Sequence, residues 1–424
     1  MSTIVVYEQG AVTPMRLLGA VGAGRQLIVI LSPSEHARRM RPLFAETCVA
    51  VYDLTDADLR RRLADHKPTG ILTFSEPMLR ATAELAADLG LPYHELPVVD
   101  RLTSKYLQRT RLNDAGVDPT VSVRITAAEQ WEPAVREVGL PAVVKPVRGV
   151  SSRNTMLIDS VAAGRERIGE LLRVEGAVVV DEYLPGIDVP DPFGDYLSVE
   201  SLVQRGVRTH LAITGKLRLA PPFRECGQFW PARLDRTTRE GVLALTDQAI
   251  KALEVTTGIL HTEIKLTPDG PRVIEVNGRV GGYIPELARY AAGIDLVDAG
   301  IRIAGGERVD VPELDLDRVC FQFTTPAPVA RGVVTRVCDA AAVRAVPGVT
   351  AYHPLARPGT EVGGFGTQDL NLLEGEAADH EALAATVDLI MDRVEYGFDF
   401  GGGPTVRSAR DLVYTTGSDS GRGE

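Results

Sequence analysis

The first hundred residues alternate short apolar runs with amphipathic stretches, and this alternation restricts the fold more than any other feature. Four runs are apolar and end near Gly, Pro, Ser or Asp: TIVVYE, QLIVILS, CVAVYDL and GILTFSE. The stretches between them, such as EHARRMRPLFAE, carry apolar residues at helical spacing. Strands that alternate with helices predict a parallel sheet with helices on its faces. We therefore expect a small α/β domain over residues 1–100. No GxGxxG follows the first run, so a dinucleotide site is not expected there.

Composition places the chain among soluble globular proteins. Its 424 residues suggest about three domains or lobes, and 44% hydrophobic with 24% charged residues excludes disordered, collagen-like and coiled-coil classes. No apolar run reaches the ~18 residues that span a bilayer, and the N-terminus MSTIVVYEQG lacks a basic signal region. A net charge of −11 argues against a nucleic-acid partner, although a local basic cluster can still bind an anionic substrate. We expect a cytoplasmic protein without a membrane partner.

The cysteines and histidines give no sign of a disulfide framework or a zinc site. The four cysteines are far apart and lack CxxC spacing, which is typical of small core residues in a reducing compartment. The seven histidines show no HExxH or similar spacing, so we expect no structural zinc.

The middle of the chain mixes helices with strand pairs. SKYLQRTRLNDAG predicts a helix, PAVVKPVRG a strand pair and AVVVDEYL another strand. YLSVESLVQ and RTHLAITGK flank Gln204-Arg205-Gly206 and predict a hairpin, whereas 221–235 is expected to be an ordered surface loop and 236–258 a long helix. Residues 310–400 are expected to hold short β segments and one helix, HEALAATVDLIMDRVEY, and the last 24 residues a solvated tail.

The stretch HTEIKLTPDGPRVIEVNGRVGG, residues 261–282, is the most informative for chemistry. It predicts two strands joined at Pro268-Asp269-Gly270, and pairing about that turn can place Glu263 across from Glu275. Glu275, Asn277 and Arg279 point the same way because alternate strand residues share a face. Two carboxylates and an amide oxygen suit Mg²⁺ together with substrate phosphates, and the arginine suits phosphoryl charge. The alternative is an exposed hairpin that simply carries acidic residues.

Two lysines support the first interpretation. Lys145 ends the apolar strand PAVVKP, where it can meet a phosphate, and Lys105 also falls at the edge of an element. The small-residue turn after Lys145, residues 147–152, could cover phosphates with backbone N–H groups and hydroxyls. The strand AVVVDEYLPG could present main-chain groups to an adenine edge.

Together these motifs resemble the ATP-grasp superfamily over roughly residues 1–400. The resemblance implies an ATP-grasp fold of α/β class with α+β lobes: an N-terminal parallel-sheet domain at 1–100, a nucleotide-clamping small lobe at 101–190, and a large lobe at 191–400. The large lobe would end in a β-rich subdomain at about 310–400, and a flexible tail would follow at 401–424.

The resemblance also assigns residues. It implies that ATP is bound by the two lysines, the phosphate loop, the hinge and an acidic residue: Lys105, Lys145, Ser151, Ser152, Asp181, Glu182, Tyr183, Leu184 and Glu200. Glu263, Glu275 and Asn277 would bind Mg²⁺, with Mn²⁺ as an alternative, and Arg279, Lys145 and His261 would be catalytic. A satisfied strand histidine is the other interpretation of His261. The ribose-binding acid stays open between Asp188 and Asp195, and the lid is expected at 148–153 and 216–233.

Within the superfamily, GRVGGYIPELARYAAGIDLV and the β-rich lobe look most like amino-acid (dipeptide) and carnosine-synthase-like ligases. This implies an ATP-dependent carboxylate–amine ligase that forms an amide through an acyl phosphate and releases ADP and phosphate. Its substrates would be small carboxylates and amines, as in dipeptide or antibiotic biosynthesis, and a homodimer stays open. Arg224, Phe229, Trp230, Gly281 and Gly282 are the substrate candidates, although packing is the alternative for the two aromatics.

Two other functions stay open on the same fold. One is a purine-pathway-type ligase or a carboxylase that phosphorylates bicarbonate. The other is a catalytically idle nucleotide-binding scaffold. The identities of donor and acceptor, and whether the acceptor is free or carrier-bound, are left undecided by the sequence.

Overall fold

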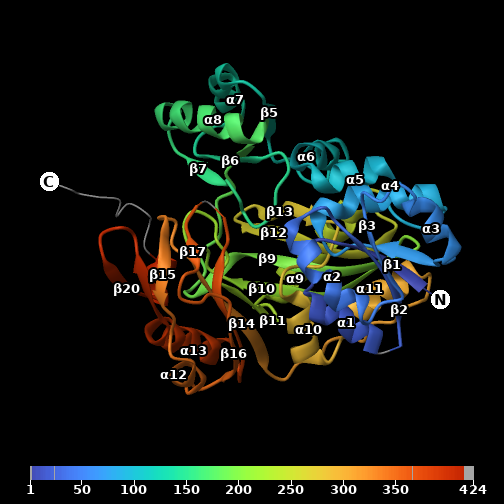
Figure 1. Ribbon diagram of the computed structural model, residues 1–424. Coiled ribbons are helices and arrows are strands. Elements are labelled where there is room, and N and C mark those ends of the chain that lie inside the picture. The colour runs from blue at the N-terminus through green and yellow to red at the C-terminus, as the bar shows by residue number, and fades with distance from the viewer. Residues whose placement is uncertain (1, 23, 365, 415–424) are drawn as a thin grey trace.

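The apolar runs of the first hundred residues form four parallel strands, as their pattern predicted (Figure 1). The computed structural model describes residues 2–22, 24–364 and 366–414. All residues of the first strand are buried, since helices cover both faces of the sheet. The elements are β1 (Ser2–Tyr7), α1 (Pro14–Gly22), β2 (Gln26–Leu31), α2 (Glu35–Ala45), β3 (Ala50–Asp53), α3 (Leu59–Asp65), β4 (Gly70–Leu72), the 3₁₀ helix η1 (Glu76–Met78) and α4 (Leu79–Leu89). The sheet order is β3-β2-β1-β4, and α1 is a helix that the sequence pattern did not predict.

Two helices connect this domain to the rest and cover the edge of the largest sheet. They are α5 (Leu96–Thr103) and α6 (Lys105–Asp114), and Ser104 caps α6 by accepting from the Leu107 backbone N–H. Gln108 of α6 donates to the Val276 carbonyl at 2.9 Å and accepts from the Val276 N–H at 2.7 Å. Val276 lies in the edge strand β13 (Gly270–Asn277), whose outer backbone groups need partners. This docking fixes Lys105 beside the edge strand.

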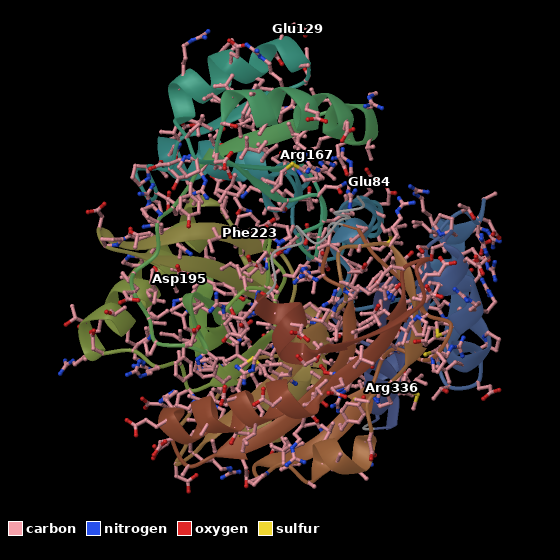
Figure 2. The ribbon with its side chains drawn as sticks, turned by 90° about the vertical axis from the view of Figure 1, so that its left-hand side faces the viewer. Glu84, Glu129, Arg167, Asp195, Phe223 and Arg336 are labelled. Carbon is pink, nitrogen blue, oxygen red and sulfur yellow. The ribbon has the colours of Figure 1, made fainter. Side chains whose placement is uncertain are left out.

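The small lobe is a four-stranded antiparallel sheet with helices on one side, and it stands above the body in Figure 1. Its elements are β5 (Ser122–Ile125), the 3₁₀ helix η2 (Ala128–Gln130), α7 (Trp131–Val138), β6 (Ala142–Pro146), β7 (Met156–Ile158), α8 (Val161–Glu175) and β8 (Val178–Glu182), in sheet order β5-β8-β6-β7. Trp131 is fully buried in its core. Figure 2 shows the same lobe from the side, with Glu129 at its outer end.

An eight-stranded antiparallel sheet forms the centre of the molecule, in the order β13-β12-β9-β10-β11-β14-β18-β16. Its further strands are β9 (Phe193–Gln204), β10 (Val207–Leu217), β11 (Gly227–Trp230), β12 (Thr257–Thr267), β14 (Val319–Pro326), β16 (Val349–Pro354) and β18 (Asp369–Ala377). The predicted hairpin around Arg205-Gly206 is confirmed by the pairing of β9 with β10. The prediction of a surface loop over 221–235 is wrong for 227–230, because β11 is a buried strand between β10 and β14. For the same reason, 216–233 is not a lid.

Helices join the central sheet to the N-terminal domain. They are α10 (Ile284–Ala292) and α11 (Leu296–Ala304), which share an apolar core with the N-terminal strands, whereas α9 (Arg236–Ala252) packs against β13 and α6. Gly70 of β4 lies so close to α11 that a Cβ atom there would be 2.2 Å from the Ala304 carbonyl oxygen. This contact packs the amino end of β4 against the carboxyl end of α11.

The C-terminal region contributes strands to the central sheet and also forms a second sheet. Strands β14, β16 and β18 belong to the central sheet, and the second sheet, of order β17-β15-β19-β20, packs nearby, with Arg336 of β15 labelled in Figure 2. The remaining elements are β15 (Gly332–Arg336), α12 (Ala340–Arg344), β17 (Glu361–Val362), α13 (His380–Arg393), β19 (Glu395–Asp399), β20 (Pro404–Ser408) and α14 (Ala409–Tyr414). The predicted tail from residue 401 is therefore wrong for 404–414, and 415–424 lies outside the described residues. Within the described residues, no helix is long and apolar enough to cross a membrane.

Candidate active site

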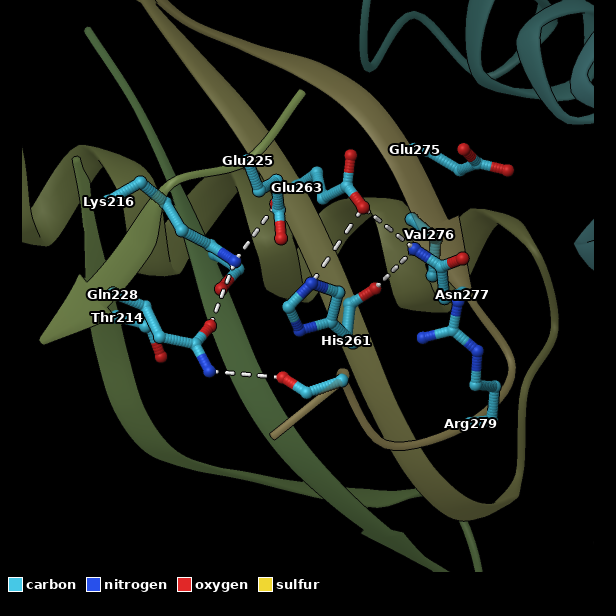
Figure 3. A network of polar contacts seen from close by, with 12 residues as sticks. Thr214, Lys216, Glu225, Gln228, His261, Glu263, Glu275, Val276, Asn277 and Arg279 are labelled. Atoms are coloured by element: carbon cyan, nitrogen blue, oxygen red, sulfur yellow. Dashed lines mark hydrogen bonds and ion pairs between the residues drawn. The ribbon is translucent and has the colours of Figure 1, made fainter. Parts of the chain in front are cut away.

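The acidic hairpin has the register that the sequence predicted. Strands β12 and β13 pair with Glu263 opposite Glu275 and with His261 opposite Asn277 (Figure 3). Asn277 Nδ2 donates to Glu263 Oε1 at 3.3 Å. Burial and the facing Glu275 carboxylate together raise the pKa of Glu263. Two like charges therefore face each other on one face of the central sheet.

Lys105 neutralises one of these two carboxylates. Its Nζ donates to Glu275 Oε1 at 2.5 Å and to the Gly149 carbonyl at 3.1 Å. Burial favours the neutral form of both partners, but the Lys105 ammonium outweighs it and holds the pKa of Glu275 below its usual value. Lys105 also ties the start of α6 to the phosphate loop, because its backbone N–H donates to the Val147 carbonyl.

The second predicted lysine, Lys145 in β6, forms an ion pair with Asp181 in β8. The Nζ to Oδ2 distance is 2.8 Å, and Ser122 donates to the other Asp181 oxygen at 2.6 Å. Burial alone would raise the pKa of Asp181, but the Lys145 ammonium lowers it by more. The pKa of Asp181 is therefore below its usual value. The Asp181 side chain is engaged by Lys145 and Ser122, and its predicted contact with an adenine stays a prediction.

The rest of the hinge follows β8 and is half-buried. Glu182 accepts from the Val121 N–H at 3.0 Å, so its side chain fastens the start of the small lobe. Tyr183 and Leu184 lie in the following connection. Of the two ribose candidates, Asp195 pairs with Lys265 at 2.6 Å and Asp188 is exposed, and the choice between them stays open.

The predicted phosphate loop has an unusual backbone. Ser151, Ser152 and Asn154 all have positive φ, between 51° and 56°, in the left-handed region that side chains rarely adopt. Ser151 is exposed and its carbonyl accepts from the Thr367 N–H at 2.9 Å. The loop of the small lobe thus touches the loop before β18 across the molecule.

Glu200 of β9 and His261 of β12 form a buried pair next to Glu263. Glu200 is fully buried and contacts His261 Nδ1 at 2.9 Å, and it also accepts from Ser198 and Thr214. The other ring nitrogen of His261 lies 3.7 Å from Glu263 Oε1. Glu200 therefore orients the histidine beside Glu263, and its predicted contact with the nucleotide stays a prediction.

The glycines after the hairpin are explained by their neighbours. A Cβ atom on Gly281 would lie 2.4 Å from His261 Nδ1, so only glycine lets this segment cross the histidine. The Gly282 carbonyl accepts from Gln228 Nε2 at 3.0 Å. Their predicted contact with a substrate stays a prediction.

Arg279 binds a carboxylate from the N-terminal domain. Its Nη2 lies 3.3 Å from Glu76 Oε2, and Glu76 is 6% exposed. Burial raises the pKa of Glu76 to about 7 even though Arg279 opposes the shift. The sequence analysis did not select Glu76 as a site residue. Its position four residues after the buried parallel strand β4 was the available signal, since ligand sites form at the carboxyl ends of such strands.

The three substrate candidates from 216–234 have packing roles, which corrects that prediction. Arg224 is 4% exposed and donates to the carbonyls of Ala327, Pro221 and Leu412. Phe229 is in the hydrophobic core, and Trp230 is fully buried with its Nε1 on Thr214 Oγ1 at 2.7 Å. A guanidinium enclosed by backbone carbonyls is not available for a substrate carboxylate.

The same stretch instead supplies Lys216, Glu225 and Gln228, which sequence reasoning did not select (Figure 3). Lys216 Nζ donates to Glu225 Oε1 at 3.1 Å and to Gln228 Oε1 at 3.0 Å. Lys216 outweighs the effect of burial and lowers the pKa of Glu225. No sequence pattern marks these residues, because only the pairing of β10 with β11 brings them together.

The hairpin fits a divalent cation. The two facing carboxylates repel each other unless a positive charge lies between them, and the Asn277 amide lies next to Glu263. The described residues contain no group of three or more His, Cys, Asp or Glu side chains that could hold a metal ion alone. Mg²⁺ is commonly bound by one or two carboxylates together with phosphate oxygens, which agrees with this smaller set.

Comparison with known proteins gives a family match for this region. Residues 102–283 match the family model of the ATP-grasp domain, the family that the motifs of the chain resemble. The range contains both lysines, the hinge and the acidic hairpin.

Relatives with this domain include ligases. Alanine–anticapsin ligase of Bacillus subtilis is 26% identical over 268 residues, which cover 59% of this chain and 54% of the relative. Carnosine synthase 1 of Homo sapiens is 24% identical over 269 residues, 58% of this chain and 32% of the relative. The chain therefore matches only part of the length of these relatives.

Solved structures agree on the fold over nearly the whole chain. L-amino acid ligase from Bacillus licheniformis superposes with a TM-score of 0.77 at 19% identity, covering 93% of this chain and 98% of the other. N5-carboxyaminoimidazole ribonucleotide synthetase from Thermotoga maritima gives 0.68 at 16% identity, covering 96% and 100%. At these identities the likeness shows the ATP-grasp fold.

Proposed function

We propose that the chain is an ATP-dependent carboxylate–amine ligase that forms an amide bond through an acyl phosphate and releases ADP and phosphate. The observation that carries the proposal is the facing pair Glu263 and Glu275, with Lys105 on one carboxylate and Arg279 two residues beyond Asn277. This set offers both the acidic ligands and the cations that a phosphoryl transfer needs.

The chemistry follows from the charges. A carboxylate is a poor acyl donor, so its oxygen first attacks the γ-phosphorus of ATP and ADP leaves. The amine nitrogen then attacks the acyl carbon, the C–N bond forms and the C–O bond to phosphate breaks. Mg²⁺ bound by Glu263, Glu275 and Asn277 would neutralise phosphoryl oxygens. Lys105, Lys145 and Arg279 would add positive charge around the same group.

The loop at 148–153 would exclude water from the reactive acyl phosphate. Its position next to Lys105, through the Gly149 carbonyl, supports this role. Glu200 would keep His261 oriented beside Glu263.

The substrate class comes from the relatives. The name of alanine–anticapsin ligase describes a ligase that acts on the amino acid alanine, and the name of carnosine synthase describes an enzyme that makes carnosine. We therefore propose that this chain joins two amino acids, or an amino acid and a specialised metabolite. The structural likeness to a purine-pathway synthetase does not favour bicarbonate, because it extends to the fold alone.

The test measures phosphate release from ATP and Mg²⁺ with amino acids offered singly and in pairs, with mass spectrometry of the positive wells. The proposal predicts release only with a pair, and a product mass equal to both substrates minus water. Glu275→Gln should abolish this activity, whereas Glu361→Gln, at an exposed position of β17, is the matched control and should keep it. Release with bicarbonate alone would contradict the proposal.

A further inference from the structure

Four neighbouring strands of the central sheet, β10, β11, β14 and β18, carry a row of polar side chains. Strand β9 lies between these strands and the acidic hairpin. Lys216 of β10 lies opposite Gln228 of β11, which lies opposite Gln322 of β14, which lies opposite Glu374 of β18. Hydrogen bonds connect each neighbour to the next: Lys216 to Gln228 at 3.0 Å, Gln228 to Gln322 at 2.9 Å, and Gln322 to Glu374 at 3.2 Å. All three bonds run in one direction, from the lysine to the glutamate.

Most hydrogen-bond donors of the side chains in this row already have acceptors within the protein. Both Nε2 hydrogens of Gln228 are engaged, one by Gln322 and one by the Gly282 carbonyl. Lys216 spends two hydrogens on Gln228 and Glu225, and its side chain is 2% exposed. The row therefore has few donors left for a ligand.

The acceptors beside the row are not satisfied in the same way. Asp369, at the start of β18, accepts from the Tyr283 hydroxyl with Oδ2 at 3.0 Å. Its other oxygen, Oδ1, is buried and makes no hydrogen bond within the described residues. Glu225 is engaged through Oε1 by Lys216, and 42% of its side chain is exposed. A buried carboxylate oxygen without a partner is unfavourable unless a donor completes it.

Tyr283 connects Asp369 to the active site. It follows Arg279 by four residues in the segment that crosses His261, and its φ of 58° is rare for a bulky residue. Strand β14 connects Glu225 with Asp369, because its Thr324 hydroxyl donates to the Glu225 carbonyl at 3.5 Å and its Pro326 pairs with Asp369. Burial and, less strongly, the Glu225 charge raise the pKa of Asp369 and of Glu263 in the acidic hairpin.

We infer that Asp369, together with Glu225, binds an ammonium group of the amine substrate. Acceptors without donors select a cationic donor, and an ammonium group is the small cation that an amine ligase handles. The inference rests on the proposed function. It concerns the chemistry of an ammonium group, which the substrate can carry either at the reacting amine or on its side chain.

The test uses the full chain and a substrate pair found active with the unmodified protein. Asp369→Asn removes the charge but keeps an acceptor for Tyr283, and Asp315→Asn is the same change at an exposed position. We expect Asp369→Asn to raise KM for the amine by about 10- to 100-fold, the factor for one charge-assisted hydrogen bond, while KM for ATP and the carboxylate stays within about twofold. Asp315→Asn should change none of the three.

A second comparison separates the two sources of the ammonium group. If Asp369 binds the reacting amine, the variant raises KM equally for lysine and norleucine as acceptors. If it binds a side-chain ammonium, the unmodified protein prefers lysine and the variant loses that preference. Should Asp369→Asn fail to bind ADP, Glu225→Gln carries the same test.

The two proposals fail separately. Absence of turnover by the unmodified chain over all pairs contradicts the ligase. An active unmodified chain, with variants that keep an unchanged KM for the amine or change only the KM for the carboxylate, contradicts the ammonium site.

Discussion

The ion pair between Lys105 and Glu275 should stabilise the ligand-free protein, because it offsets the repulsion between two buried carboxylates. Lys105 and Glu275 side chains are 12% and 14% exposed, and their charged atoms are 2.5 Å apart. At an effective dielectric constant of about 20, such a pair has a gross attraction of about 7 kcal/mol, most of which desolvation cancels. We expect a net coupling of about 2–3 kcal/mol.

A double-mutant cycle measures this coupling. Lys105→Met alone should destabilise the protein by about 3–5 kcal/mol, because Glu275 is then left unpaired opposite Glu263. Glu275→Gln alone should cost less, since Lys105 keeps the Gly149 carbonyl. The double variant should therefore be more stable than the sum of the two single effects predicts.

The assay is urea unfolding followed by circular dichroism, at pH 7.5, without nucleotide or divalent cation. The exposed pair Arg236 and Glu240, 2.7 Å apart on α9, is the matched control, and its coupling should be at most about 0.5 kcal/mol. Single effects at Lys105 and Glu275 that add within about 0.5 kcal/mol would refute the reasoning.

Three further outcomes are expected. Gly281→Ala should lower stability by about 1–3 kcal/mol and reduce kcat, because the new methyl group would meet His261; denaturation and turnover measure both. Burial raises the pKa of Asp369 to about 7, so the folded protein binds its proton more tightly than the unfolded chain and stability falls as pH rises from about 4 to 7. Asp369→Asn should remove this fall, worth about 2–4 kcal/mol, in unfolding curves at pH 5 and 8. Mg²⁺ added together with ADP should raise the melting temperature of the unmodified chain above the value with ADP alone, and Glu263→Gln should lose this additional rise.

The sequence predicts those parts of the fold whose signals are local. The four N-terminal strands are apolar runs and the hairpin around Asp269 has a turn signal, so the type of these strands and the register of the hairpin could be predicted. The pairing of Glu263 with Glu275 follows from that register, and the acidic half of the site with it.

Other parts depend on contacts between distant segments. β11 is only four residues long, lies between prolines and begins at a glycine, so its pattern resembles a loop, and only pairing with β10 and β14 makes it a strand. Asp369 and Tyr283 are 86 residues apart and meet because Asp369 starts a strand paired with β14. Arg224 was misassigned because a charged residue in a polar stretch gives no sign that backbone carbonyls enclose it.

The measurement that tests the central claim most directly follows an oxygen atom. With an active pair, the carboxylate substrate is labelled with ¹⁸O in its carboxyl group, and the released phosphate is analysed by mass spectrometry. The acyl-phosphate route predicts ADP as the nucleotide product and one ¹⁸O atom in each phosphate. Unlabelled phosphate, or AMP with pyrophosphate, would contradict it.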